Sequence, residues 1–237
     1  MTPILFKRIN MHRGILSKNK CLLEQNINLI RENSNLKKYI LGDNEMNLTN
    51  YKQWINLANH LTAWEPRTEV IAKMIQPNSS IIEFGAGRQA LLKYIDKSCA
   101  YQPSDIVDRG DNTIIIDLNT DNLPNLSKYD YAVFSGVLEY IQDVPRVVKW
   151  LNTFVNNVVM SYLVEEGKGE EVTQERRGHG WLNEYSDSEI IDLFNKNNFT
   201  LQDKSEWIDP IPGTNSGWKH IIYSFKNMDL CQDQKNT

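Results

Sequence analysis

Residues 80–88, Ser-Ile-Ile-Glu-Phe-Gly-Ala-Gly-Arg, constrain the fold of this chain more than any other stretch. The first five read as a short buried strand that carries an acid, Glu83, near its end and runs into a Gly-x-Gly turn. Residues 89–97 have apolar side chains at helical spacing, which predicts a helix. A strand, a glycine turn and a helix N-terminus bring backbone N–H groups to one point, which suits a nucleotide-like ligand.

The chain has 237 residues, enough for one sizeable domain and an appendage. Its net charge is −4, but residues 1–20 carry +5, which leaves −9 on the remainder. An acidic body argues against nucleic acid as a partner. The three cysteines lie far apart without Cys-x-x-Cys spacing. We therefore expect no metal site and no disulfide framework, and a reducing cytoplasm as the setting.

The N-terminal part of the chain reads as a separate extension. Residues 20–41 have apolar side chains at helical spacing, with leucines at 22, 29 and 36, and a Gly-Asp-Asn break follows. We divide the chain into a basic, helical extension, residues 1–48, and a main domain, residues 49–237. The leucine spacing raises a homodimer through the N-terminal helices as one option, and packing on the main domain as the other. No apolar run reaches the length of a membrane-spanning helix, so we expect no stable membrane insertion.

Within the main domain, short apolar runs alternate with helical patterns. Strands are predicted at residues 80–84, 99–102, 113–116, 131–134, 158–163, 200–208 and 219–225. Helices are predicted within residues 51–75, as two helices parted at 65–67, and at 144–154 and 187–197. Ser186 and Glu189 form a capping-box pattern before the last of these. The predicted fold class is α/β, a Rossmann-like sheet that is mostly parallel with an antiparallel last strand.

The glycine turn by itself fits two cofactors. Gly85-Ala-Gly-Arg-Gln-Ala with Asp105 twenty residues later matches the dinucleotide fingerprint, so NAD(P) is an alternative. Glu83 argues against it, because a carboxylate beside a pyrophosphate is repelled in a cleft of low dielectric. The same carboxylate suits a ligand with an ammonium and a sulfonium group. Asp105 and Asp117 end the next two strands, where acids suit ribose hydroxyls and an adenine amine.

These residues resemble the motifs of the class I S-adenosylmethionine-dependent methyltransferases. Residues 82–87 are similar to the first motif, Asp105 to the ribose-binding acid, 116–119 to the adenine-side motif and 129–141 to the fourth-strand motif. The resemblance covers residues 50–226, although the links 105–113 and 117–130 are too short for full helices. It implies S-adenosylmethionine as the cofactor. The cofactor-binding residues that it implies are Glu83, Gly85, Ala86, Gly87, Asp105, Asp117, Leu118, Ser135 and Gly136.

We expect the residues that bind the methyl acceptor in a lid, residues 164–185, which follows the fifth strand. His179 lies between two glycines and is a candidate base, since an imidazole accepts protons near neutral pH. Two arginines could bind a phosphate or a carboxylate. The candidate substrate-binding residues are Arg176, Arg177, Trp181 and Tyr185, and the candidate catalytic residues are His179, Tyr140 and Glu139. Each has a structural alternative: a solvated loop for His179, packing for Tyr140, and a helix N-terminal acid for Glu139.

The function expected from these features is methyl transfer to a small-molecule acceptor. The preferred acceptor is a hydroxyl of a sugar, a nucleotide-sugar or a cell-surface glycan precursor, in bacterial polysaccharide biosynthesis. The chain lacks the Asn/Asp-Pro-Pro-Tyr/Phe motif of amino methylases that act on DNA bases or protein glutamine. Two alternatives stay open at this point. One is an NAD(P)-dependent sugar-modifying oxidoreductase, which is disfavoured because the sequence has no recognisable Tyr-x-x-x-Lys pair. The other is a non-catalytic methyltransferase-like binding module.

Overall fold

The computed structural model describes residues 49, 51–56, 64–110, 112–164, 174, 176–208 and 219–230. The chain divides into two compact units, Met1–Met46 and Asn47–Thr237, and all described residues belong to the second. The predicted extension, residues 1–48, and positions 165–173 and 175 of the predicted lid therefore lie outside the described residues. The boundary near residue 48 and the homodimer stay predictions.

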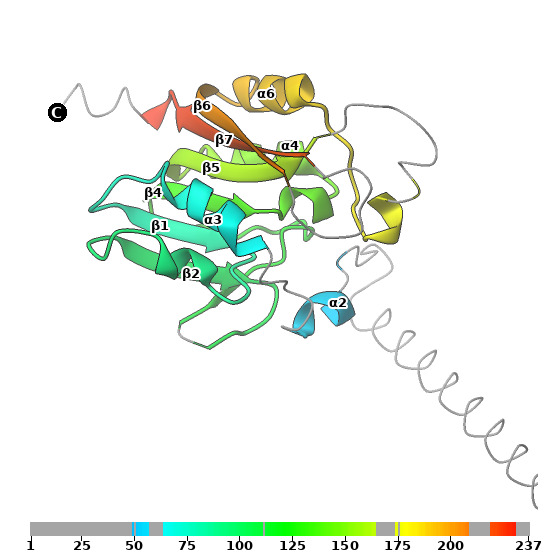
Figure 1. Ribbon diagram of the computed structural model, residues 1–237, viewed down its shortest axis with the longest axis horizontal. Helices are drawn as coiled ribbons and strands as arrows, with labels where there is room; N and C mark the ends of the chain where they lie inside the picture. The colour runs from blue at the N-terminus through cyan, green and yellow to red at the C-terminus, as the bar shows by residue number, and fades with distance from the viewer. Residues whose placement is uncertain are drawn as a thin grey trace, which may run out of the picture. The chain divides into compact units, whose positions relative to one another are not determined.

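A seven-stranded sheet forms the centre of the described domain (Figure 1). Its order is β3-β2-β1-β4-β5-β7-β6. The strands β1 to β5 pair in parallel, whereas β7 is antiparallel to both β5 and β6. The prediction of a mostly parallel sheet with an antiparallel last strand is confirmed. The strands are β1 Ser80–Phe84, β2 Ala100–Asp105, β3 Ile114–Ile115, β4 Tyr129–Ser135, β5 Val155–Leu163, β6 Phe199–Ile208 and β7 Lys219–Asn227.

The helices cover both faces of the sheet with separate apolar clusters. Helix α3 (Glu65–Ala72) packs on one face, while α4 (Val144–Leu151) and α6 (Asp187–Asn195) pack on the other. A further helix, α2 (Tyr51–Ile55), precedes them along the chain. Pro66 lies in the first turn of α3, and Ser186 with Glu189 forms a capping box at α6, both as predicted. No helix among the described residues is long and apolar enough to span a membrane.

The prediction of a helix after the glycine turn is wrong. Residues 89–97 form only a 3₁₀ turn, η3 (Ala90–Lys93), because Gln89 adopts a left-handed backbone conformation with φ of 55° at its start. Of its four residues only Leu91 is buried, so little packing stabilises a longer helix. The short links after β2 and β3 are as expected, and residues 116–128 contain no helix. The carboxyl ends of β1, β2 and β4 therefore stay open at one edge of the sheet.

Candidate functional site

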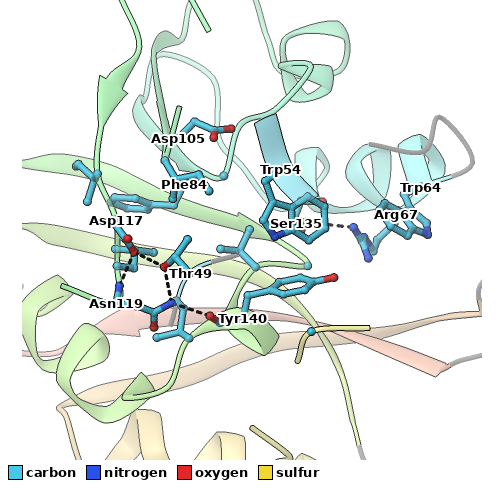
Figure 2. A pocket seen from close by; sticks show the side chains of 18 residues that line it. Thr49, Trp54, Trp64, Arg67, Phe84, Asp105, Asp117, Asn119, Ser135 and Tyr140 are labelled. Atoms are coloured by element: carbon cyan, nitrogen blue, oxygen red, sulfur yellow. Dashed lines mark hydrogen bonds between the residues drawn. The ribbon is translucent and has the colours of Figure 1, made fainter. Parts of the chain in front are cut away.

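A cavity of about 140 Å³ lies at the carboxyl ends of the parallel strands (Figure 2). This is the edge of an open α/β sheet at which ligands bind. Each of the first four strands contributes residues from its end. Phe84, Asp105 and Ser135 are the last residues of β1, β2 and β4. The residues that follow the strand ends are Gly85 after β1, Ile106 after β2, Ile116, Asp117, Leu118 and Asn119 after β3, and Gly136 and Val137 after β4.

Gly85 is the member of the glycine turn that lines this main cavity. Its φ is +65°, a conformation that side chains disfavour, and a Cβ there would lie 2.7 Å from Cγ2 of Val137. Gly87, with φ of 48°, donates its N–H to Oδ2 of Asp105 at 2.9 Å. The turn therefore brings bare backbone to the cavity and orients the carboxylate at the end of β2.

Glu83 and Ala86 are not among the residues that line this cavity. The Glu83 side chain is 3% exposed and accepts a hydrogen bond from the Tyr101 hydroxyl. Burial raises the pKa of Glu83 to about 8. The Tyr101 hydrogen bond lowers this pKa, and the nearby Asp105 charge raises it. Ala86 donates its N–H to the Ser104 carbonyl at 3.0 Å, which fixes the turn to β2.

Asp105 joins the glycine turn to helix α2. Its carboxylate accepts from the Gly87 N–H and pairs with Nε of Arg109 at 3.4 Å. Arg109 in turn donates to the main-chain carbonyls of Trp54 and Ile55, the latter at 2.9 Å. The Asp105 carboxylate also accepts from the Val107 N–H at 3.2 Å. A carboxylate has about four lone-pair positions, so these three contacts leave room for a hydroxyl donor from a ligand.

Asp117 fixes the segment in front of helix α2 to the cavity (Figure 2). Its two oxygens accept from the Thr49 and Tyr51 hydroxyls, each at 2.7 Å. The Asn119 amide donates to Thr49 Oγ1 at 3.0 Å and to the Tyr140 carbonyl at 2.9 Å. Thr49 and residues 51–55 are thus tied to the ends of β2 and β3 by side chains that line the cavity or adjoin it.

The remaining walls of the main cavity are largely apolar and aromatic. Trp54 contacts Tyr140 edge to face, with ring centroids 4.8 Å apart. Burial raises the pKa of the Tyr140 hydroxyl, which therefore stays protonated at neutral pH. Phe84, Ile106 and Leu118 offer apolar surface next to the carboxylates at the ends of β2 and β3. Apolar walls beside carboxylates fit a nucleoside, whose base is planar and whose ribose carries hydroxyl donors.

A second cavity of about 30 Å³ adjoins the main one. Four residues line both cavities, and three more complete the second. The shared residues are Trp64, Arg67, Gly136 and Tyr140, and the others are Glu139, Trp181 and His220. A 3₁₀ turn after β4, η4 (Leu138–Tyr140), supplies the carboxyl group of this cavity.

Glu139 is a buried acid with one oxygen left over. The side chain is 2% exposed, and Oε1 accepts from the Leu163 N–H at 2.9 Å. Oε2 has no hydrogen-bond partner among the described residues. Burial raises the pKa of Glu139, and the Leu163 hydrogen bond and the charges of Arg67 and Arg176 oppose that shift. Glu139 therefore lines the second cavity with a carboxylate whose acceptor capacity is not fully used by the described residues.

Arg67 faces that acid from the first turn of α3. It is 4% exposed, its Nη2 donates to the Ser135 carbonyl at 3.1 Å, and its Nη1 lies 3.4 Å from Nδ1 of His220. The guanidinium lies 5.6 Å from the Trp64 ring centroid. Burial lowers the pKa of His220 to about 3, and the Arg67 charge acts in the same direction, so this imidazole is neutral.

The structure divides the predicted lid residues into two groups. Arg176 and Trp181 are buried, with the guanidinium 4.9 Å from the Trp181 ring centroid and donating to the Leu163 carbonyl at 2.9 Å. Of these two residues, Trp181 lines the second cavity and Arg176 does not. Arg176 therefore supports the wall that Trp181 forms.

Three other predicted residues line neither of the two cavities. They are His179, Arg177 and Tyr185. The His179 ring is exposed and lies 5.3 Å from that of Trp181, and Arg177 pairs with Glu184 at 3.9 Å. Tyr185 packs against Tyr162, with ring centroids 6.1 Å apart.

The sequence analysis did not identify several residues of the two cavities as site residues. They are Thr49, Trp54, Trp64, Arg67, Asn119 and His220. One signal was available for Arg67. A cation in the first turn of a helix is unfavourable because of the helix dipole, which indicates that this arginine has a role outside the helix. The others come from helical or strand patterns that packing explains equally well.

Comparison with known proteins defines the class. A family model described as a methyltransferase domain matches residues 57–204, more than half of the chain. The chain belongs to this methyltransferase family. It is an S-adenosylmethionine-dependent methyltransferase, and the NAD(P) and non-catalytic alternatives are not supported. No curated protein sequence matches the chain significantly.

Solved structures show the same fold at low identity. The 1,6-didemethyltoxoflavin-N1-methyltransferase of Burkholderia thailandensis, bound to its substrate and S-adenosylhomocysteine, has a TM-score of 0.55 and 13% identity over 75% of this chain and 83% of that one. The N-methyltransferase NodS of Bradyrhizobium japonicum with S-adenosylhomocysteine gives 0.52 and 12% over 82% and 97%. The magnesium protoporphyrin IX methyltransferase of Synechocystis gives 0.51 and 15% over 83% and 94%.

Proposed function

We propose that this enzyme transfers a methyl group to a hydroxyl oxygen of a small molecule, with a sugar, a nucleotide-sugar or a cell-surface glycan precursor as the preferred acceptor. The observation that carries the proposal is Glu139, whose Oε2 has no described hydrogen-bond partner and which lines a cavity next to the cofactor cavity. A hydroxyl group that enters this cavity can donate to that oxygen. The aromatic side chains around it are compatible with a sugar ring.

In this proposal the main cavity holds the cofactor. Gly85 lets the backbone approach the methionine part, and Asp105 accepts hydrogen bonds from the ribose. Asp117 and Leu118 lie on the adenine side, and Ser135 and Gly136 on the sulfonium side. Glu83, Ala86 and Gly87 do not line the cavity and contribute indirectly, because they set the shape of the turn and the orientation of Asp105.

The bound cofactor supplies an activated methyl group on a sulfonium. The chain's residues then have two tasks, to align the acceptor and to take its proton. Glu139 accepts the proton at Oε2, and burial makes its carboxylate a better base than an exposed one. Tyr140 and Trp181 form the walls, and Arg176 positions Trp181.

His179 stays a second candidate for the base. Its ring is exposed and lines neither of the two cavities, whereas Glu139 lines the second. Arg177 and Tyr185 stay candidates for contact with the outer part of the acceptor.

The experiment that tests this function has two stages. Calorimetry should show binding of S-adenosylhomocysteine and none of NADH. The protein is then incubated with methyl-labelled S-adenosylmethionine and pools of sugars and nucleotide-sugars, and labelled products are identified by mass spectrometry and NMR. An O-methyl product supports the proposal, and N-methyl or C-methyl products contradict it.

Substitution identifies the base once a product is known. Glu139→Gln should lower turnover by about 100-fold, the lower end of what a general base contributes, and leave the affinity for S-adenosylhomocysteine unchanged. His179→Gln is the matched comparison. If it removes turnover while Glu139→Gln does not, the base is His179 and our assignment is wrong.

A further inference from the structure

A buried guanidinium lies in the wall that the two cavities share. Arg67 lines both, and its Nη2 contacts the Ser135 carbonyl at 3.1 Å (Figure 2). Gly136 makes this approach feasible, because a Cβ there would lie 2.8 Å from Nη2 and 2.9 Å from Nη1. The cation is therefore held against the turn that the proposed function places on the sulfonium side.

The second cavity offers a donor and an acceptor to one small group. At about 30 Å³ it holds a single polar group rather than a ring. Arg67 and Glu139 both line it, and Oε2 of Glu139 has no hydrogen-bond partner among the described residues. A hydroxyl group, which both donates and accepts, satisfies the two together.

The charge state of the cavity follows from its titratable groups. The His220 imidazole is neutral, so it adds polarity without charge beside Arg67. The Tyr140 hydroxyl is protonated, because burial raises its pKa. Arg67 is charged at every accessible pH. The guanidinium is thus the fixed cation of the cavity wall, with the Glu139 carboxyl as its counterpart.

We propose that the second cavity is the acceptor subsite and that Arg67 is its specificity-determining residue, which selects a hydroxyl as the reacting group and rejects an ammonium or an amine. This inference rests on the proposed function. An ammonium would lie near the Glu139 carboxylate and near two guanidinium groups, those of Arg67 and Arg176, whose charges both act on Glu139. The cations would then outnumber the anion in a site with little water, where like charges repel strongly. A neutral amine would become a cation on methylation, in the same place.

A hydroxyl avoids both costs, and its reaction balances. The hydroxyl oxygen forms the new O–C bond as the C–S bond breaks, and the electron pair of that bond stays on sulfur. The hydroxyl proton moves to Oε2 of Glu139. The products in the cavity are a neutral ether and a protonated carboxyl group, so no second cation forms beside Arg67.

The test measures binding and needs no knowledge of the natural acceptor. The full-length protein is saturated with S-adenosylhomocysteine and titrated with benzyl alcohol and benzylamine, probes of matched shape that differ in charge at neutral pH. Ligand-observed NMR gives both affinities. We expect benzyl alcohol to bind at least about tenfold more tightly, which corresponds to about 1.4 kcal/mol of charge repulsion. Arg67→Gln should reduce the preference to about threefold or less, and Arg67→Lys, which keeps the charge, should retain it.

The outcomes separate the two proposals. If the wild-type protein does not bind S-adenosylhomocysteine, the proposed function fails. If it binds S-adenosylhomocysteine but binds benzylamine as well as benzyl alcohol, or neither probe, only the inference about Arg67 fails. Thermal melting shows whether each variant is folded. Should Arg67→Gln not fold, the wild-type preference and its retention in Arg67→Lys decide the matter.

Discussion

Two glycines of the described chain share a left-handed backbone but differ in their surroundings. Gly85 has φ of +65°, and a Cβ there would lie 2.7 Å from Cγ2 of Val137, whereas Gly110 has φ of +76° and a Cβ there would meet nothing within 4 Å. Alanine should cost about 1 kcal/mol of backbone strain at either position. Only Gly85→Ala should also push Val137 into the cofactor cavity and lower the affinity for S-adenosylhomocysteine, by at least about tenfold.

Calorimetry on the two alanine variants checks this prediction, with Gly110→Ala as the matched control. Equal loss of affinity in both variants would show that backbone strain, and not the contact with Val137, governs binding. Thermal melting should show a loss of stability in both variants, the larger one in Gly85→Ala because of the contact with Val137.

Glu83 makes stability depend on pH. Its pKa in the folded state, about 8, exceeds the ordinary value of 4.5, so the folded protein holds a proton that the unfolded chain releases between these values. The stabilisation is complete below about pH 4.5 and is lost as the pH rises through about 8. Glu83→Gln keeps an acceptor for the Tyr101 hydroxyl but cannot ionise. It should therefore match the wild type near pH 5 and be more stable near pH 9.

Urea unfolding of both proteins across this pH range measures the effect. Other buried acids such as Glu139 titrate equally in both proteins, so the difference between the two curves isolates Glu83. Parallel curves at all pH values would contradict a raised pKa at this position.

Helix α2 depends on contacts outside itself. With five residues it is too short to be stable alone. The hydroxyl of Tyr51 donates to Asp117 at 2.7 Å, Arg109 donates to the Ile55 carbonyl at 2.9 Å, and Trp54 contacts Tyr140. Tyr51→Phe removes one of these contacts, worth about 1 kcal/mol. We expect faster amide exchange at residues 51–55 and an affinity for S-adenosylhomocysteine that is several-fold lower.

A second tyrosine–aspartate pair supplies the control. Tyr223 of β7 donates to Asp187 of α6 at 2.9 Å, and neither residue lines the two cavities. Tyr223→Phe should lower stability by a similar amount but leave exchange at residues 51–55 unchanged in hydrogen-exchange mass spectrometry. If Tyr223→Phe speeds that exchange as much as Tyr51→Phe does, α2 responds to global stability alone.

The elements differ in how far the sequence alone determined them. Strands such as β4 and β5 were predicted because their apolar runs are continuous, as in strands buried on both faces. Residues 89–97 have a helical pattern too, yet only η3 forms, because the left-handed Gln89 and the single buried Leu91 depend on tertiary packing. Periodicity reports which residues can be buried, and the neighbouring elements decide which are.

At the scale of the molecule, the part of the site on the sheet was predictable and the part in front of it was not. Asp105 and Asp117 were found because parallel strands end at one edge. Thr49 and Arg67 reach the site from segments before the sheet, each to a partner 68 residues away, Asp117 and Ser135 respectively. No local pattern encodes such contacts, since they depend on how α2 and α3 pack.

The two compact units of the chain suggest a deletion experiment that tests the predicted division into an N-terminal extension and a main domain. Every described residue that lines either cavity belongs to Asn47–Thr237. Deletion of residues 1–46 should therefore leave the affinity for S-adenosylhomocysteine within about twofold, a difference below 0.5 kcal/mol. If the N-terminal helices form a homodimer, light scattering should show the mass falling from that of a dimer to that of a monomer, whereas packing of these helices on the main domain would leave a monomer before and after the deletion. A deletion protein that stays dimeric would place the homodimer contact elsewhere.

The contacts of Arg109 have a thermodynamic consequence. One side chain touches both the carboxylate of Asp105 and the last carbonyls of α2, at Trp54 and Ile55. A ligand that engages this carboxylate therefore changes the environment of the group that holds the helix. By reciprocity, whatever orders the helix strengthens the binding of that ligand to the same degree. Affinity for the cofactor and order in α2 are then linked by a single coupling free energy.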